Sequence, residues 1–129
     1  MGSIKIPIET SARHIHISRE DFEKLFGEGK ELTFVKELSQ PGQYLAKERI
    51  TIAGPRGTFE NVAILGPFRK ETQVELSLTD TRKIGVAGVI RQSGDIEGTP
   101  GCKLITEDKE LEIEKGVIVA KRHIHMTPG

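Results

Sequence analysis

The sequence predicts a mainly β protein, built as a small β-barrel with one or two short helices. Two observations lead to this fold class. Short stretches in which apolar and polar residues alternate recur along the 129-residue chain, and glycine and proline separate them. In addition, only one stretch combines a helical apolar stripe with start and stop residues. A chain of this length has room for one ordinary domain or two very small ones.

The first half of the chain holds three of the expected strands. Alternating isoleucines predict a strand over 4–12 that leads into the tetrapeptide RHIH at 13–16. The stretches RITIA at 49–53 and NVAIL at 61–65 flank the turn GPRG at 54–57. A glycine- and proline-containing turn between two apolar runs is typical of a β-hairpin, so we expect these two strands to pair.

One helix is expected directly after the tetrapeptide. Ser18 is a favoured N-cap residue, and Asp21 three residues later approximates a capping box. An apolar stripe over 22–26 follows, and Gly27 supplies a stop signal. These residues predict a short amphipathic helix that begins after Ser18.

The second half is expected to hold four further strands. TQVELSL at 72–78 alternates cleanly, and 84–90 is an apolar run that contains two glycines. Leu111 and Ile113 indicate a third strand, and VIVA at 117–120 a fourth. Between these pairs of strands, glycines and a proline over 94–101 mark a long bend.

Composition excludes several classes of partner and location. The net charge is zero at neutral pH, which removes the electrostatic case for binding nucleic acid or an anionic membrane. A single cysteine, Cys102, allows no internal disulfide, and we expect it to be a small buried residue rather than a nucleophile. No signal peptide or membrane-spanning run is visible, so we expect a cytoplasmic protein.

All four histidines of the chain lie in two copies of one tetrapeptide, RHIH at 13–16 and 122–125. In each copy a strand leads into the motif and a helix-start residue follows two positions after the second histidine: Ser18 in the first copy, Thr127 in the second. The second copy ends where its helix is expected to begin. We interpret this as an internal duplication, and we expect a longer parent chain.

The spacing of the histidines predicts metal binding. Residues i and i+2 of a strand point to the same face, so His14 and His16 project together, as do His123 and His125. Two imidazoles placed in this way can converge on one ion. Zinc is the first choice because imidazole suits it, and cobalt, nickel and copper stay open.

Two histidines need a third ligand, and the pattern leaves its identity open. Carboxylates on strands or at bends are candidates: Glu75, Asp80 and Asp95. Alternation by itself places Glu75 on an ordinary solvent face. A guanidinium such as that of Arg69 suits phosphate or carboxylate. However, the pattern alone favours a plain surface position for this arginine, and equally for Lys70 and Arg56.

Five motifs, in order, cover nearly the whole chain and carry a resemblance. They are SARHIHIS, ELSQPGQ, GPFRKETQVELS, RQSGDIEGTPG and EKGVIVAKRHIHMTP. Together they resemble the PduL-type phosphotransacylases, also called phosphate propanoyltransferases. The resemblance implies a duplicated two-barrel architecture with a two-zinc site between the barrels. It also implies an activity: acyl-CoA and phosphate are converted reversibly into acyl phosphate and coenzyme A.

The resemblance assigns roles to individual residues. It implies that His14, His16 and Glu75 bind one zinc ion, and that His123 and His125 bind the other. It further implies that Arg69 holds phosphate. The coenzyme A pocket would be lined by the remaining matched positions, which are Thr10, Ser11, Ala12 and Arg56.

The resemblance also divides the chain. It implies a central β-barrel domain over 13–120 with a lid hairpin around 31–47, while 1–12 and 121–129 are strands of a second, incomplete barrel. Family chains continue past the second RHIH to a last metal-binding histidine, and Ala63 stands where the family often has a basic residue. Because unpaired strand edges invite pairing, we expect a homo-oligomer, formed by strand exchange.

Two other functions compete with acyl transfer. One is a non-catalytic zinc-binding or assembly module, and the other is a hydrolase that uses a zinc-activated water. The resemblance also implies a location either free in the cytoplasm or inside a bacterial microcompartment.

Overall fold

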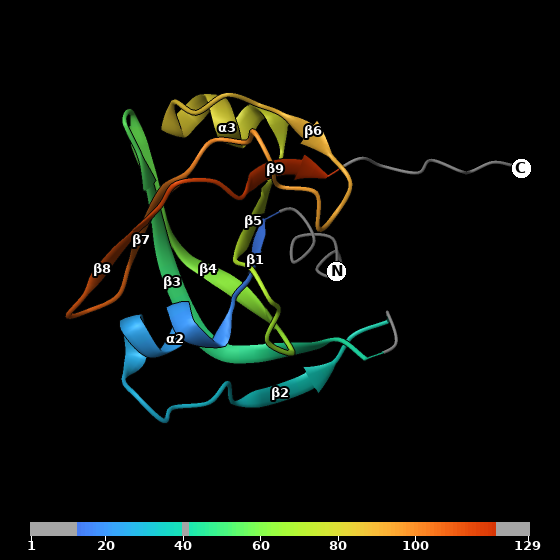
Figure 1. Cartoon of the computed structure of the whole chain (residues 1–129), viewed down its shortest axis with the longest axis vertical. Helices are drawn as coiled ribbons and strands as arrows, with labels where there is room; N and C mark the ends of the chain where they lie inside the picture. Colours follow the sequence, from blue (N-terminus) through green and yellow to red (C-terminus); the bar gives the residue numbers. More distant parts are fainter. Residues whose placement is uncertain (1–12, 40–41, 121–129) are drawn as a thin grey trace, which may run out of the picture.

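A curled β-sheet with two short helices makes up the part of the chain that the computed structural model describes, residues 13–39 and 42–120 (Figure 1). This confirms the predicted mainly β class. In chain order the elements are β1 (His14–His16), α2 (Arg19–Phe26), β2 (Phe34–Glu37), β3 (Tyr44–Gly54), β4 (Gly57–Gly66), β5 (Gln73–Leu76), α3 (Leu78–Ile84), β6 (Ile90–Arg91), β7 (Cys102–Ile105), β8 (Glu110–Ile113) and β9 (Val117–Ala120).

The short strand β1 lies in the middle of this sheet. The strand order is β6-β9-β5-β1-β4-β3-β7-β8, with β2 paired to β3. β1 runs parallel to β4 and antiparallel to β5, so three segments distant in the sequence lie side by side. In this register His14 has Ala63 on one side and Glu75 on the other. The first RHIH motif is therefore held from both sides by backbone hydrogen bonds.

The predicted β3–β4 hairpin is present. Gly54 pairs with Gly57, and the ladder continues to Tyr44 and Gly66 with two irregularities. β2 pairs antiparallel with β3 in the region where a lid hairpin was expected, and residues 40–41 lie outside the described part. Since β3 also pairs with β7, this long strand joins the hairpin to the last third of the described chain.

The predicted helix after the first motif is confirmed as α2. The Ser18 side chain accepts a hydrogen bond from the backbone N–H of Asp21 at 3.1 Å, and the helix ends at Gly27, whose φ is 122°. Phe22 and Leu25 face the core and are buried. Burying a side chain such as that of Phe22 contributes about 2 to 3 kcal/mol, which fixes α2 against the sheet.

The second half departs from the prediction in one place. The strand expected over 72–78 ends at Leu76, because the Ser77 side chain accepts a hydrogen bond from the N–H of Asp80 and starts α3. The strand expected over 84–90 was wrong. Ile84 ends α3 facing the core, Gly85 closes the helix with φ 83°, and only Ile90–Arg91 is extended. The strands expected around Leu111 and at 117–120 are confirmed as β8 and β9.

The core lies between the curled sheet and the helices; α3 packs against β4 and β5, and α2 against β8. Every strand from β3 onward except β6 and β8 contributes at least one fully enclosed side chain. The buried apolar cluster contains Ile15, Ile17, Phe22, Leu25, Ala46, Ile50, Ile52, Val62, Ile64, Val74, Leu76, Ile84, Cys102, Leu104 and Val117. Neither of the two helices described here is long and apolar enough to cross a membrane.

Candidate metal centre

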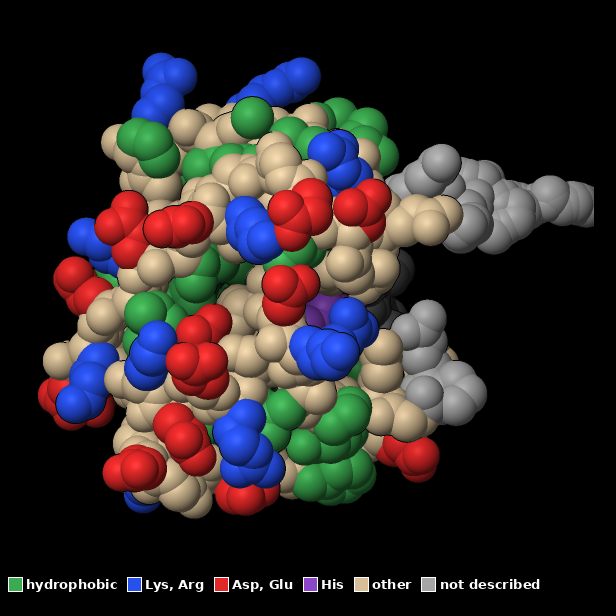
Figure 2. Space-filling model, viewed as in Figure 1, with side chains coloured by type: hydrophobic (Ala, Val, Ile, Leu, Met, Phe, Trp, Pro, Cys, Tyr) green, Lys and Arg blue, Asp and Glu red, His purple; other side chains and the backbone are tan. Residues whose placement is uncertain are grey.

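The side chains of His14 and His16 lie on the same side of β1, as their spacing predicts. Their ring centroids are 4.9 Å apart with the planes nearly perpendicular, while Ile15 between them points into the core with no exposed surface. Both histidines are buried, at 8% and 4% exposure. Figure 2 accordingly shows only a small histidine surface, beside basic and acidic side chains. The pair is therefore almost entirely shielded from solvent.

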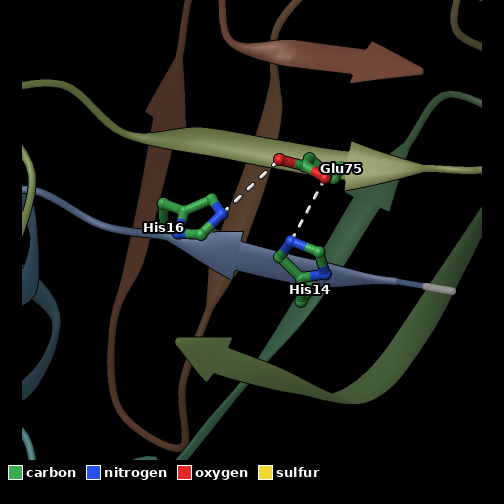
Figure 3. Close-up of side chains that lie close together, drawn as sticks. All are labelled: His14, His16 and Glu75. Carbon is green, nitrogen blue, oxygen red and sulfur yellow. Dashed lines mark ion pairs between the residues drawn. The ribbon is translucent and has the colours of Figure 1, made fainter. Parts of the chain in front are cut away.

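Glu75 completes a three-residue cluster with these histidines. β5 pairs with β1 so that Glu75 lies opposite His14, and its carboxylate faces one nitrogen of each imidazole ring (Figure 3). His14 Nε2 is 3.2 Å from Glu75 Oε1, and His16 Nε2 is 3.5 Å from Oε2. Alternation along 72–78 could not single out this glutamate. The pairing of β5 with β1 brings it to the histidines.

Burial and mutual contact set the charge state of the cluster. Burial by itself raises the pKa of the Glu75 carboxyl, but the hydrogen bonds and charges of His14 and His16 outweigh it, and the net pKa is well below its usual range. Burial lowers the pKa of His16, the Glu75 hydrogen bond opposes this, and the charges of His14 and Arg69 add to the lowering. At neutral pH the cluster therefore offers a carboxylate and a neutral His16 imidazole, the forms that bind metal.

These donors fit a divalent cation. Two ligands bound at about 2.1 Å in tetrahedral geometry lie about 3.4 Å apart. The candidate ligand atoms of His14, His16 and Glu75 all lie within 4.8 Å of one another, so small side-chain adjustments bring them to this spacing. Two imidazole nitrogens and one carboxylate oxygen also form a donor set typical of zinc sites with an open position. Among the described residues, these three side chains form a cluster of histidine and acidic groups close enough together to hold an ion.

Arg69 lies next to the cluster. Its backbone N–H donates to the carbonyl of Ile17, which joins the segment after β4 to the end of the first motif. The half-buried side chain extends toward Ser93 Oγ, at 3.4 Å from Nη1. Because the Arg69 charge also lowers the pKa of His16, the guanidinium and the histidine pair belong to one electrostatic environment.

The sequence patterns did not predict a role for Gln73 or Ser93. Gln73, only 2% exposed, donates from Nε2 to Glu75 Oε2 at 2.7 Å and to Ser93 Oγ at 3.1 Å. Alternation placed Gln73 on the same face as Glu75, so period two was the signal that could have found it. Ser93 belongs to the long bend, and no local pattern connects that bend to β5.

The remaining candidate residues lie elsewhere. The other proposed third ligands do not join the histidines, because Asp80 pairs with Arg13 and the exposed Asp95 is 3.7 Å from Arg91. Arg56 is exposed in the β3–β4 turn, where its backbone N–H donates to Ile84 at the end of α3. Lys70 is exposed as well.

Cys102 is buried, as predicted, and burial raises the pKa of its thiol to about 12. Thr10, Ser11, Ala12, His123 and His125 lie outside the described residues.

The curled sheet and its enclosed cluster define a β protein with a candidate metal centre on its central strand. Comparison with known proteins then places the chain. Residues 7–129 match the sequence model of the family described as phosphate propanoyltransferase. The chain belongs to this family, which confirms the assignment made from its motifs.

Individual relatives carry the same name. A phosphate propanoyltransferase of Clostridioides difficile (strain 630) is 60% identical over 123 residues, which make up 95% of this chain and 59% of that protein. One of Thermotoga maritima is 63% identical over 123 residues, again 95% of this chain and 59% of that protein. One of Leptotrichia buccalis is 62% identical over 120 residues, or 93% and 57% of the two chains. The chain thus spans less than two thirds of the length of these relatives.

Proposed function

We propose that this chain acts in phosphotransacylation, in which phosphate and coenzyme A are exchanged on a short-chain acyl group. In this reaction acyl-CoA and phosphate give acyl phosphate and coenzyme A. The observation that carries the proposal is the His14, His16 and Glu75 cluster next to Arg69, in a chain that belongs to the phosphate propanoyltransferase family.

Arg69 is the proposed phosphate-binding residue. A guanidinium offers five N–H donors in a planar fork that matches phosphate oxygens. Among the described residues its side chain makes one long hydrogen bond, to Ser93, so most of these donors stay available. Holding phosphate here would place one of its oxygens for attack on the thioester carbonyl carbon. As the new C–O bond forms, the C–S bond breaks and coenzyme A leaves as a thiolate.

We propose that His14, His16 and Glu75 hold a zinc ion, which when bound supplies positive charge to polarise the carbonyl or stabilise the thiolate. His123 and His125 are the proposed ligands of a second ion. Thr10, Ser11, Ala12 and Arg56 are the proposed coenzyme A contacts. The transfer is direct: the buried Cys102 thiol, with its pKa raised to about 12, is a poor candidate for a covalent acyl carrier.

The experiment is to follow thiol release from acetyl-CoA with and without phosphate and with and without a chelator. We expect release that requires phosphate and stops when the metal is removed. Glu75→Gln keeps the shape of the side chain but loses the charge, and we expect it to abolish release. Glu60→Gln, at an exposed position on β4, is the matched control and should keep the activity of the unaltered protein.

The other outcomes separate the competing functions. Phosphate-independent release of free acid would mark a zinc-dependent hydrolase. Bound zinc without any thiol release would favour a non-catalytic zinc-binding or assembly module. A rate of thiol release that is unchanged by the chelator would show that the reaction needs no metal.

We also propose that the chain forms a homo-oligomer, by strand exchange. In the described residues the sheet ends at β6 on one side and β8 on the other, and Ile90 on β6 is 53% exposed. Such edges favour pairing with another chain. Light scattering after size exclusion should give at least a dimer, and a monomer at high concentration would contradict this. Location in the cytoplasm or in a bacterial microcompartment stays a prediction that cell fractionation can test.

A further inference from the structure

Gln73 connects the candidate metal ligand Glu75 to the bend that follows β6. Its side-chain amide makes three hydrogen bonds: Nε2 donates to Glu75 Oε2 at 2.7 Å and to Ser93 Oγ at 3.1 Å, and Oε1 accepts from the backbone N–H of Gly94 at 2.6 Å. The side chain is 2% exposed. Every hydrogen of the amide nitrogen is therefore used, in a place where leaving one unpaired is costly.

These contacts determine which way the amide faces. The Gly94 N–H is a donor, so it must meet the carbonyl oxygen Oε1. Consequently Nε2 has to face the carboxylate of Glu75. An amide turned the other way would set two oxygens against each other and two N–H groups against each other. The orientation of Gln73 thus follows from the network itself.

This orientation makes the two oxygens of Glu75 unequal. Oε2 accepts the short hydrogen bond from Gln73 and lies 3.5 Å from His16 Nε2, while Oε1 lies 3.2 Å from His14 Nε2 and accepts nothing from Gln73. A carboxylate whose second oxygen is held by an outer donor presents its first oxygen in a defined direction. The Gln73 amide would therefore select Oε1 as the single oxygen given to an ion between the histidines.

The same network reaches Arg69. Ser93 Oγ accepts hydrogen bonds from both Gln73 Nε2 and Arg69 Nη1, at 3.1 and 3.4 Å. The Ser93 hydroxyl therefore links Gln73, which holds the candidate ligand Glu75, to the guanidinium of Arg69. A shift of Glu75 would be passed through the Gln73 amide to Ser93, and from there to the position of Arg69.

We propose that Gln73 is a positioning residue that orients Glu75 for the metal and couples it to the Ser93–Gly94 bend that Arg69 contacts. This inference rests on the proposed metal-binding role of His14, His16 and Glu75. It predicts that zinc binding changes the protection of the Gly94 amide in the bend, and that this effect disappears without the Gln73 amide.

The test compares Gln73→Met with Gln92→Met in the full chain. Methionine fills a similar volume without hydrogen bonds, and the exposed Gln92 makes the same substitution a matched control. Zinc is titrated while NMR follows the imidazole signals of His14 and His16. This separates zinc binding at these two residues from binding at His123 and His125. We expect Gln73→Met to bind zinc about ten- to hundredfold more weakly, as for other outer-sphere partners, and Gln92→Met to stay within twofold of the unaltered chain.

Hydrogen exchange at Gly94 provides a second readout. In the unaltered chain, zinc should slow exchange of the Gly94 amide, and in Gln73→Met zinc should leave it unchanged. If Gln73 had a purely structural role, its substitution would change exchange of the Gly94 amide equally with and without zinc. If Gln73→Met does not fold, Ser93→Ala at an exposed position takes its place. It removes the Ser93 hydroxyl that accepts from Gln73 and from Arg69, and losing the hydrogen bond to Gln73 should weaken zinc binding about fivefold.

A folded Gln73→Met, or a Ser93→Ala, that binds zinc within twofold of the unaltered chain would overturn the proposal. Failure of the proposed function gives a different result. In that case acyl transfer is absent while the zinc affinities still differ as expected. An unaltered chain that binds no zinc at this site overturns the role of Gln73, and any phosphate-dependent transfer it shows then needs no metal.

Discussion

Arg13 and Asp80 form a two-bond ion pair between the residue that precedes β1 and the first turn of α3. Arg13 Nε is 3.0 Å from Asp80 Oδ2, and Nη2 is 3.1 Å from Oδ1. The guanidinium also lies 3.8 Å above the ring of Phe59. Since β1 carries the histidines and α3 follows β5, this pair joins the two ligand-bearing segments outside the sheet ladder. The arginine of the first RHIH motif thus has a structural role that is separate from metal binding.

Asp80→Asn should therefore destabilise the fold. Asp80 is 7% exposed, and losing its charge leaves the Arg13 guanidinium without its partner. We expect a loss of about 2 kcal/mol in the free energy of unfolding, less than for a fully buried pair because the Arg13 side chain is 37% exposed. Urea unfolding measures it. Glu31→Gln, which breaks the exposed pair with Arg19, should change the free energy by less than about 0.5 kcal/mol.

Glu75→Gln should leave the fold intact and remove most of the zinc affinity. The variant loses the only negative charge of the three-residue cluster while it keeps the volume of the side chain. Losing a ligand should cost more than the roughly hundredfold that losing an outer partner can cost. Competition with a chromophoric chelator measures the affinity. Equal zinc affinity in Glu75→Gln and Glu60→Gln would exclude Glu75 as a ligand.

Cys102 should resist alkylation while the chain is folded. A thiol with its pKa raised to about 12 holds only about one part in ten thousand as thiolate at pH 8. In the unfolded chain the ordinary pKa of 9.0 returns, and the thiolate fraction rises about a thousandfold. Mass spectrometry after iodoacetamide treatment should show labelling in denaturant and almost none without it. Rapid labelling of the folded chain would contradict the burial of this residue.

The same thiol makes a contribution to stability that depends on pH. The folded pKa lies above the unfolded value, so the contribution is complete below about pH 9 and is lost as the pH rises toward 12. Cys102→Ala should therefore lose less stability than the unaltered chain between these pH values. Urea unfolding at several alkaline pH values measures the difference.

Gly116→Ala should disturb the strand next to the ligand-bearing strand. Gly116 has φ 121°, and a Cβ there would lie 2.6 Å from the carbonyl oxygen of Thr72. The Gly116 carbonyl also accepts from Val74, at the start of β5. We expect a loss of about 3 kcal/mol or more. Gly29→Ala, with φ 81° and open space around it, should cost only about 1 kcal/mol, so thermal unfolding of the two variants should differ clearly.

Local patterns were sufficient where one short segment carries all the information. The Ser18 cap and the apolar residues Phe22 and Leu25 specified α2, because helix capping and a helical stripe act within a few residues. The β3–β4 hairpin followed from its turn in the same way. The strand expected over 84–90 failed because the apolar residues near Gly85 belong to a helix end and a loop, which alternation cannot tell from a strand.

The composition of the site depended on contacts between distant segments. Two imidazoles on one face followed from the spacing of His14 and His16, since successive strand residues alternate in direction. Alternation puts Gln73 on the face of Glu75, but no local pattern gives its contact with Ser93. The choice of Glu75 over Asp80 and Asp95 and the position of Arg69 did not follow from a local pattern either.

The sequence by itself therefore determined a mainly β chain with a strand that presents paired histidines, because side-chain direction on a strand is set by the backbone of that strand alone. The family resemblance pointed to Glu75, but only the tertiary structure shows why this carboxylate meets the histidines and which side chains hold it. The antiparallel pairing of β5 with β1 aligns Glu75 with His14, and the bend after β6 brings Ser93 to Gln73. Strand order and register determine these side-chain contacts, and both arise only when segments far apart in the chain pack into one sheet.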